Sequence, residues 1–294
     1  MSDRNLIELR RGGFELDLCP RSGGAITRFR HDGRDLLRPA GAAMLAGGDP
    51  GFASCFPLVP FSNRVADARF RFRGRAYELP RNFLPEPHAI HGQGWQNPWD
   101  VATAGARRAE LTFRHAVSDT PLDYRARQIF ELEDDGLAVT IEVTNAGRGP
   151  MPAGIGQHAY FIRTERVTLR AGLDHVWLAD ERKIPKERVA VPARWDFAKT
   201  PRIATVELDN CFDGWDGRAE IFWPENDLSL RLEADPVFGH LVVYVPPGED
   251  FFCVEPVSHA NDGFNLLDRG VPGTGVRVLK PGEQLAGTIR LRIG

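Results

Sequence analysis

The side chains best able to carry out acid–base chemistry are scattered singly along this chain. Glu255 follows the apolar run Phe251–Val254, and His158 stands just before Tyr160 and Phe161. Titratable groups are rare in apolar runs unless they are paired or functional, and apolar surroundings raise the pKa of a carboxyl group. An imidazole, by contrast, exchanges its proton near neutral pH. The two residues are therefore candidates for an active site that is assembled from separate strands, with a paired glutamate and a core histidine as the structural alternatives.

Three further polar positions occur in comparable settings. Arg64, preceded by Asn63, offers a planar fork of donors that can hold two neighbouring hydroxyl groups, and Asp209 offers acceptors that can orient a hydroxyl. His91 is followed by Gly92, which lets the backbone approach a ligand closely. Taken alone, Arg64 and Asp209 are better explained by solvated or structural ion pairs.

Taken together and in order, the segments around these residues resemble the aldose 1-epimerase (galactose mutarotase) family, from about residue 20 to the C-terminus. The resemblance implies that Glu255 is the catalytic base, that His158 is the general acid towards the ring oxygen, and that His91 assists there. It also implies that Arg64 and Asp209 bind sugar. The segments are Phe61-Ser62-Asn63-Arg64-Val65, His91-Gly92-Gln93-Gly94-Trp95, Gly156-Gln157-His158-Ala159-Tyr160, Leu208-Asp209-Asn210-Cys211-Phe212 and Phe251-Phe252-Cys253-Val254-Glu255-Pro256.

The chain departs from the family pattern at two places. Ala159 replaces the proline that commonly follows the catalytic histidine, and Gln93 replaces a glycine in the His91 loop. Neither change removes an imidazole. We expect Asn63 to orient Arg64, and Trp95 to lie near the ligand, where its face can stack on a sugar ring. Asp213 is the alternative to Asp209 if that loop is aligned differently.

Composition indicates an ordinary globular protein whose ligand is small. The chain has 294 residues, of which 42% are hydrophobic and 26% charged, with a formal net charge of -3. This balance gives no reason to expect nucleic acid or a membrane surface as a partner. No run approaches the ~18 apolar residues of a membrane span. We expect a monomer or homodimer that binds a sugar and needs no cofactor or metal.

The N-terminus and the cysteines bear on where the protein works. Residues 1–5 lead into a short segment interrupted by Arg10 and Arg11, which lacks the apolar core of a secretory signal. The four cysteines are widely spaced and form no Cys-x-x-Cys motif. Reduced thiols in a cytoplasmic protein are the simplest interpretation.

Alternation of apolar and polar residues predicts an all-β fold. It recurs over 69–73, 137–144, 228–233 and 289–293, and Asp134-Asp135-Gly136 predicts a hairpin that joins 128–133 to 137–145. No amphipathic helix is evident, although 185–191 could form one short helical turn. We expect one domain, 1–294, built as a large antiparallel β-sandwich, which the resemblance sharpens to the galactose mutarotase-like supersandwich.

Three other functions remain open on sequence alone. A noncatalytic sugar-binding module could use the same fold, because fold does not guarantee activity. A hexose-6-phosphate 1-epimerase would need a cluster of basic side chains, for which Arg69, Arg71, Arg73 and Arg75 are candidates. A metal-dependent hydrolase could use His88 and His91, but the glycines and Pro87 nearby argue against the helix that would bring the two together.

Overall fold

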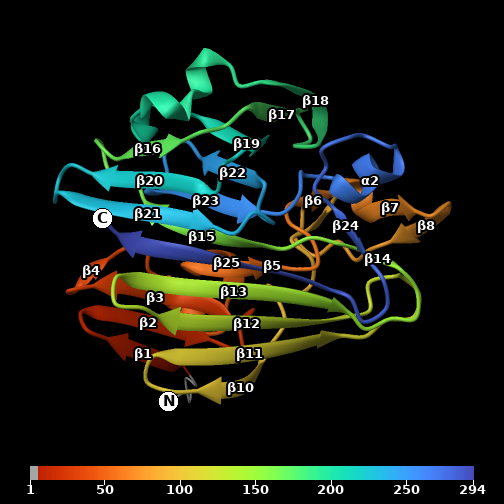
Figure 1. The fold of residues 1–294 in the computed structure, drawn as a ribbon, viewed down its shortest axis with the longest axis horizontal. Helices are drawn as coiled ribbons and strands as arrows, with labels where there is room; N and C mark the ends of the chain where they lie inside the picture. The colour runs from red at the N-terminus through yellow and green to blue at the C-terminus, as the bar shows by residue number, and fades with distance from the viewer. Residues whose placement is uncertain (1–5) are drawn as a thin grey trace.

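Two large antiparallel sheets form the body of the protein in a computed structural model that describes residues 6–294. Figure 1 shows the eight-stranded sheet lying across the eleven-stranded one. Residues 1–5, on which part of the secretory-signal prediction rests, lie outside the described residues. The predicted all-β class and large antiparallel sheets are confirmed.

The eleven-stranded sheet carries His158 and Glu255 on two adjacent strands. In spatial order its strands are β1 (Ile7–Arg11), β2 (Phe14–Cys19), β3 (Ala25–His31), β5 (Cys55–Leu58), β15 (Gly156–Ile162), β23 (Phe251–Val257), β22 (His240–Val245), β19 (Leu208–Asp213), β17 (His175–Ala179) and β18 (Pro185–Ala190), with β4 (Arg34–Asp35) paired to β3.

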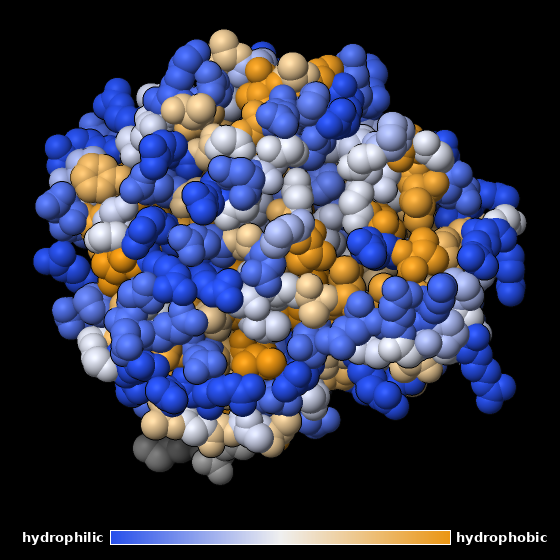
Figure 2. Space-filling model, in the orientation of Figure 1, coloured by the Kyte–Doolittle hydropathy of each residue, from blue (hydrophilic) through white to orange (hydrophobic). Residues whose placement is uncertain are grey.

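The eight-stranded sheet covers one face of the larger sheet. Its strands, in spatial order, are β10 (Asp100–Ala104), β11 (Arg108–His115), β12 (Tyr124–Leu132), β13 (Gly136–Asn145), β25 (Gln284–Ile293), β21 (Leu228–Ala234), β20 (Arg218–Trp223) and β16 (Thr168–Ala171). Hydrophilic side chains cover most of the surface in this view (Figure 2). Within this sheet, Arg127 on β12 pairs with both Glu110 and Glu142.

Several short elements lie outside the two large sheets. They are the pairs β6 (Arg64–Val65) with β9 (Ala89–Ile90), β7 (Arg69–Phe72) with β8 (Arg75–Glu78), and β14 (Met151–Ala153) with β24 (Arg277–Leu279), together with the helices α1 (Ala42–Leu45) and α2 (Gly263–Asp268). None of the helices in residues 6–294 has the length and apolar character needed to cross a membrane.

Strand alternation gives the large sheet two different faces. On β15 and β23, Phe161, Phe252 and Val254 point into the core shared by the two sheets. Their neighbours in sequence therefore point to the opposite face, where Tyr160 and Cys253 join a second apolar cluster. That second face is the one that carries the acid–base residues.

Most of the predicted strands are confirmed, and one prediction is wrong. The hairpin around Asp134 joins β12 to β13, and β7, β21 and β25 cover the other alternating segments. Residues 185–190, however, form strand β18 and no helical turn. This strand lies at the edge of the sheet and is largely exposed, so it has no buried face to produce alternation, and Lys186-Glu187-Arg188 favours helix by propensity.

Candidate active site

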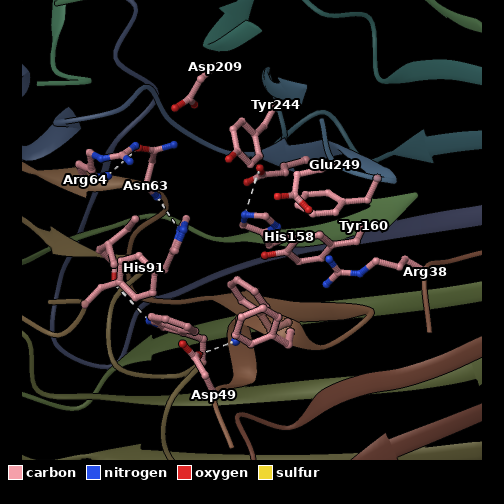
Figure 3. A pocket seen from close by; sticks show the side chains of 18 residues that line it. Arg38, Asp49, Asn63, Arg64, His91, His158, Tyr160, Asp209, Tyr244 and Glu249 are labelled. Atoms are coloured by element: carbon pink, nitrogen blue, oxygen red, sulfur yellow. Dashed lines mark hydrogen bonds and ion pairs between the residues drawn. The ribbon is translucent and has the colours of Figure 1, made fainter. Parts of the chain in front are cut away.

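A cleft of about 360 Å³ opens on the second face of the large sheet, a volume in the range of small-molecule sites. Figure 3 shows Arg64, Asn63 and Asp209 on one side of His158, with Arg38 and Tyr160 on the other. The cleft is lined by Arg38, Asp49, Gly51, Phe52, Phe56, Asn63, Arg64, Phe83, Ile90, His91, Trp95, His158, Tyr160, Asp209, Tyr244, Glu249, Phe251 and Glu255. It thus contains every residue predicted for the site.

His158 and Glu255 meet at the floor of this cleft. The pairing of Gly156 with Val257 and of Tyr160 with Cys253 fixes a register that places His158 opposite Glu255 on adjacent strands. His158 Nε2 lies 3.3 Å from Glu255 Oε1, and only 2% of the Glu255 side chain is exposed. The remaining polar atoms of the pair, His158 Nδ1 and Glu255 Oε2, are buried and have no hydrogen-bond partner among the described residues.

Burial shifts the pKa values of Glu255 and His158 in opposite directions. Loss of hydration raises the pKa of Glu255 well above its usual value, and repulsion from Asp209 raises it further. Loss of hydration lowers the pKa of His158 to about 3, and the Arg38 charge acts in the same direction. Both shifts favour the uncharged pair, with the proton on Glu255, and the 3.3 Å contact allows the proton to pass to His158.

His91 is held as a neutral hydrogen-bond donor. Its Nδ1 accepts a 3.0 Å hydrogen bond from the backbone N–H of Asn63, which leaves the proton of the neutral ring on Nε2. Burial, followed by the charges of His158 and Arg64, lowers the pKa of His91 well below its usual value. The His91 backbone has a left-handed φ of 60°, so the loop holds the ring in a conformation that non-glycine residues rarely adopt.

Gly92 makes this loop possible. Its φ is +71°, and a Cβ there would lie 2.0 Å from the carbonyl oxygen of Val59. The neighbouring Gln93, where the sequence departs from the family pattern, is fixed by its backbone N–H bond to Val59 O and by the hydroxyl of Tyr124, which donates to its Oε1. The substitution is therefore accommodated without moving the imidazole out of the cleft.

Arg64 is oriented before any ligand binds. Asn63 Oδ1 accepts from the Arg64 backbone N–H at 2.9 Å and from Nη1 at 3.2 Å, while Glu86 Oε1 accepts from Nη2 at 2.9 Å. The expected orienting role of Asn63 matches these contacts. Glu86, which the sequence reading did not single out, completes the arrangement from the loop that precedes β9.

Asp209 lies in the cleft, whereas its alternative Asp213 does not line it. Asp209 Oδ2 is 3.6 Å from Lys183 Nζ, and the residue is paired with Tyr244 across β19 and β22. Asp213, four residues later, is engaged by Arg188 through two 2.7 Å hydrogen bonds. The carboxylate available to a ligand is therefore that of Asp209.

Aromatic side chains form much of the remaining wall. Trp95 is buried against Phe56, with ring centroids 5.1 Å apart, and its indole N–H donates to Ile90 O. The ring of His158 lies between Phe56 and Tyr160, each 4.6 Å away. These contacts fix the plane of the imidazole as well as the shape of the cleft.

Several lining residues were not predicted. Tyr160, Tyr244 and Phe251 share a sheet face with the acid–base pair, and strand alternation from His158 and Glu255 could have indicated Tyr160 and Phe251. Arg38 lies in an irregular segment that carries no such periodic signal. Its guanidinium stacks on the rings of Tyr160 and Phe251, 4.2 and 4.5 Å from their centroids.

Two other sequence candidates lie outside the cleft. His88 is buried and structural, because its Nδ1 accepts from the Asp67 backbone N–H and its Nε2 contacts Arg182 O. The arginines of β7 and β8 lie on the exposed face of their hairpin, where Arg69 pairs with Glu78 at 2.6 Å. Neither the proposed His88–His91 metal pair nor the basic phosphate clamp is assembled in the cleft.

One group within the described residues has the composition of a metal site. His158, Cys253 and Glu255 each place a ligand atom within 4.8 Å of the others. All three are buried, and burial raises the pKa of the Cys253 thiol well above its usual value, whereas a metal would bind the thiolate. The same His158 and Glu255 atoms form the acid–base contact described above.

Comparison with known proteins places the whole chain in one family. The family model described as aldose 1-epimerase matches residues 5–292. The uncharacterized protein YphB of Escherichia coli is 33% identical over 296 residues, covering 98% of each chain. A crystal structure from the same species, solved as that of a candidate aldose 1-epimerase, has a TM-score of 0.89 and 34% identity over 99% of each chain.

A second solved structure has the same fold. The galactose mutarotase-like protein of Clostridium acetobutylicum has a TM-score of 0.86 at 22% identity, covering 98% of this chain and 95% of its own. On the family match over nearly its full length, the chain belongs to the aldose 1-epimerase family.

Proposed function

We propose that this protein is an aldose 1-epimerase that interconverts the α and β anomers of a free aldose. The observation that carries the proposal is the buried 3.3 Å contact between His158 and Glu255 in a cleft that also contains Arg64, Asp209 and His91. Mutarotation requires one base at the C1 hydroxyl and one acid at the ring oxygen, and this pair supplies both.

Ring opening depends on which residue of the pair carries the proton. With the proton on His158, the Glu255 carboxylate takes the hydrogen of the C1 hydroxyl while His158 donates to the ring oxygen. The bond between C1 and the ring oxygen breaks, and an open-chain aldehyde forms. Rotation about the C1–C2 bond presents the other face of the carbonyl, and both proton transfers then reverse to close the ring. The cycle consumes no cofactor.

The other residues hold the sugar during this exchange. His91 presents its Nε2–H as a donor near the reacting oxygens, because Asn63 occupies its Nδ1. Arg64 offers donors whose direction Asn63 and Glu86 have already fixed, which lowers the entropy lost when hydroxyl groups bind. Asp209 offers acceptors, and Trp95 an aromatic wall.

A phosphorylated hexose is the second candidate substrate, favoured by Arg38. This guanidinium lines the cleft and, among the described residues, has no carboxylate within 4.0 Å. Its stacking on Tyr160 and Phe251 fixes its direction without neutralising its charge. Arg38 thus takes the place of the β7–β8 arginines as the group that would meet an anion.

We also propose that the enzyme is cytoplasmic and acts as a monomer or homodimer. It is tested by polarimetry on freshly dissolved single anomers of glucose, galactose, xylose, arabinose and a hexose 6-phosphate, each with and without enzyme. Acceleration of a free aldose supports the proposal, and acceleration of the phosphate alone shifts it to the second candidate. If no sugar responds although one binds in calorimetry, a noncatalytic sugar-binding module is the better account.

A further inference from the structure

The segment that carries Arg64 has little regular structure to hold it in place. β6 consists of Arg64–Val65 alone. Asn63 before it and Asp67 after it have left-handed φ values of 54° and 52°. Such conformations cost free energy in residues other than glycine and persist only where surrounding contacts impose them. The position of the Arg64 side chain therefore depends on the contacts that hold this segment.

A buried loop holds the segment from one side. Residues 258–262, which we call the anchor loop, follow directly after β23, and none of them is more than 3% exposed. His259 Nε2 accepts a 3.0 Å hydrogen bond from the backbone N–H of Ser62, two residues before Arg64. Because a backbone N–H can only donate, the His259 ring is neutral and its Nδ1–H donates to Ala260 O at 2.7 Å. Burial, which lowers the pKa of His259 to about 4, favours the same state.

Asp262 holds the segment on the other side of Arg64. Its backbone N–H donates to Arg64 O at 2.8 Å, and its Oδ1 accepts from the backbone N–H of Ala66 at 3.0 Å. The same oxygen accepts from Asn265 Nδ2 at 2.7 Å, and Oδ2 lies 3.8 Å from the Arg269 guanidinium. Asp262 itself has a left-handed φ of 52°. The contacts thus tie the backbone at Arg64 to the anchor loop and to helix α2.

The anchor loop sets the position of Arg64 relative to the acid–base pair. The loop is continuous with β23, the strand that carries Glu255. Asn63, by contrast, lies on the same segment as Arg64 and would move with it. A displacement of about 1 Å in a group that positions substrate can lower catalytic efficiency about 10²-fold. Contacts outside the cleft therefore control the distance between a sugar-binding group and the reacting groups.

We propose that Asp262 and His259 are positioning residues, which hold Arg64 where a sugar bound at Glu255 and His158 can reach it. The inference rests on the proposed function. Neither residue is among those that line the cleft, so both act through the Arg64 segment and not by contact with substrate. Loss of either acceptor is expected to weaken sugar binding and to leave the proton transfers unchanged.

The test uses three variants of the contacts around Asp262. Asp262→Gly removes the acceptor, and glycine adopts the positive φ without strain. Asp262→Asn keeps an acceptor oxygen and removes only the charge. Asn265→Ala is the matched structural control, because it removes a different hydrogen bond of the same carboxylate. For mutarotation of the best aldose, Asp262→Gly is expected to raise KM about tenfold with kcat within twofold of wild type, whereas both other variants keep KM within twofold.

A double-mutant cycle separates positioning from a general structural effect. If Asp262 acts through Arg64, Asp262→Gly is expected to raise KM less than twofold further in the Arg64→Ala background. Circular dichroism and thermal unfolding show that each variant is folded. Should Asp262→Gly fail to fold, His259→Phe takes its place in the cycle, because phenylalanine keeps a ring and removes the acceptor for Ser62 N–H.

Three results would overturn the inference and leave the proposed function standing: an unchanged KM in Asp262→Gly, an equal rise in Asp262→Asn, or a full tenfold effect in the Arg64→Ala background. If no aldose is turned over, the proposed function fails instead. The inference is then decided without any sugar, by ¹⁵N NMR relaxation of the Arg64 Nε–H group. Its order must fall in Asp262→Gly and stay at the wild-type value in Asp262→Asn, and equal order in all three proteins would refute the positioning role.

Discussion

Replacing Glu255 with glutamine tests the assignment of the base with little disturbance of the fold. The two side chains have nearly the same shape, so the change leaves no cavity at a position that is 2% exposed. The amide can still contact His158 Nε2, now 3.3 Å from the carboxylate. What is lost is the ability to accept a proton from the C1 hydroxyl.

The expected loss of turnover is at least about 10²-fold, the usual contribution of a positioned acid or base, which corresponds to about 2.7 kcal/mol in the activation free energy. The free energy of unfolding is expected to change by less than about 1 kcal/mol, because shape is kept and a buried ionisable group is removed. Polarimetry on the best aldose gives the turnover, and urea unfolding followed by circular dichroism gives the stability. Near-normal turnover in a folded Glu255→Gln protein would refute the assignment.

Three further outcomes follow from the same geometry. His158→Ala is expected to lower kcat by at least about 10²-fold; a kcat within twofold of wild type would mean that another group protonates the ring oxygen. Glu86→Gln weakens the contact that orients Arg64 Nη2. KM is therefore expected to rise about threefold to tenfold with kcat nearly unchanged. A selective loss of kcat would contradict a substrate-binding role for Arg64. Activity needs one proton on the pair, so kcat/KM is expected to be flat at weakly acidic pH. It should fall towards about pH 3 as His158 takes a second proton, and again at higher pH as Glu255 loses its proton through a pKa raised by burial. A rate that rises steadily through neutral and alkaline pH would exclude the shared proton.

Alternation along strands explains how much of the site could be predicted from sequence. His158 and Glu255 lie on strands whose core-facing neighbours, Phe161 and Val254, mark the opposite face as the functional one. The pattern thus locates side chains that come from regular strands. The two-residue spacing from His158 to Tyr160 carries the same information and indicates that Tyr160 faces the cleft.

The rest depends on contacts that no local pattern encodes. The hydrogen bond from Asn63 to His91 joins two residues with left-handed backbone conformations, at φ of 54° and 60°. Arg38 and Glu86 reach the site from irregular segments, where neither period nor propensity indicates a direction. Their roles become visible only when the tertiary structure brings the loops together.

The central claim is that the enzyme exchanges the two anomers of an aldose without net reaction, and NMR exchange spectroscopy measures this directly. A sugar at anomeric equilibrium is mixed with a catalytic amount of enzyme, and the H1 signals of the α and β forms are examined for exchange cross-peaks. We predict cross-peaks with the wild type, and none at the same mixing time without enzyme or with Glu255→Gln. The absence of cross-peaks for every aldose that binds the wild-type protein would contradict the account.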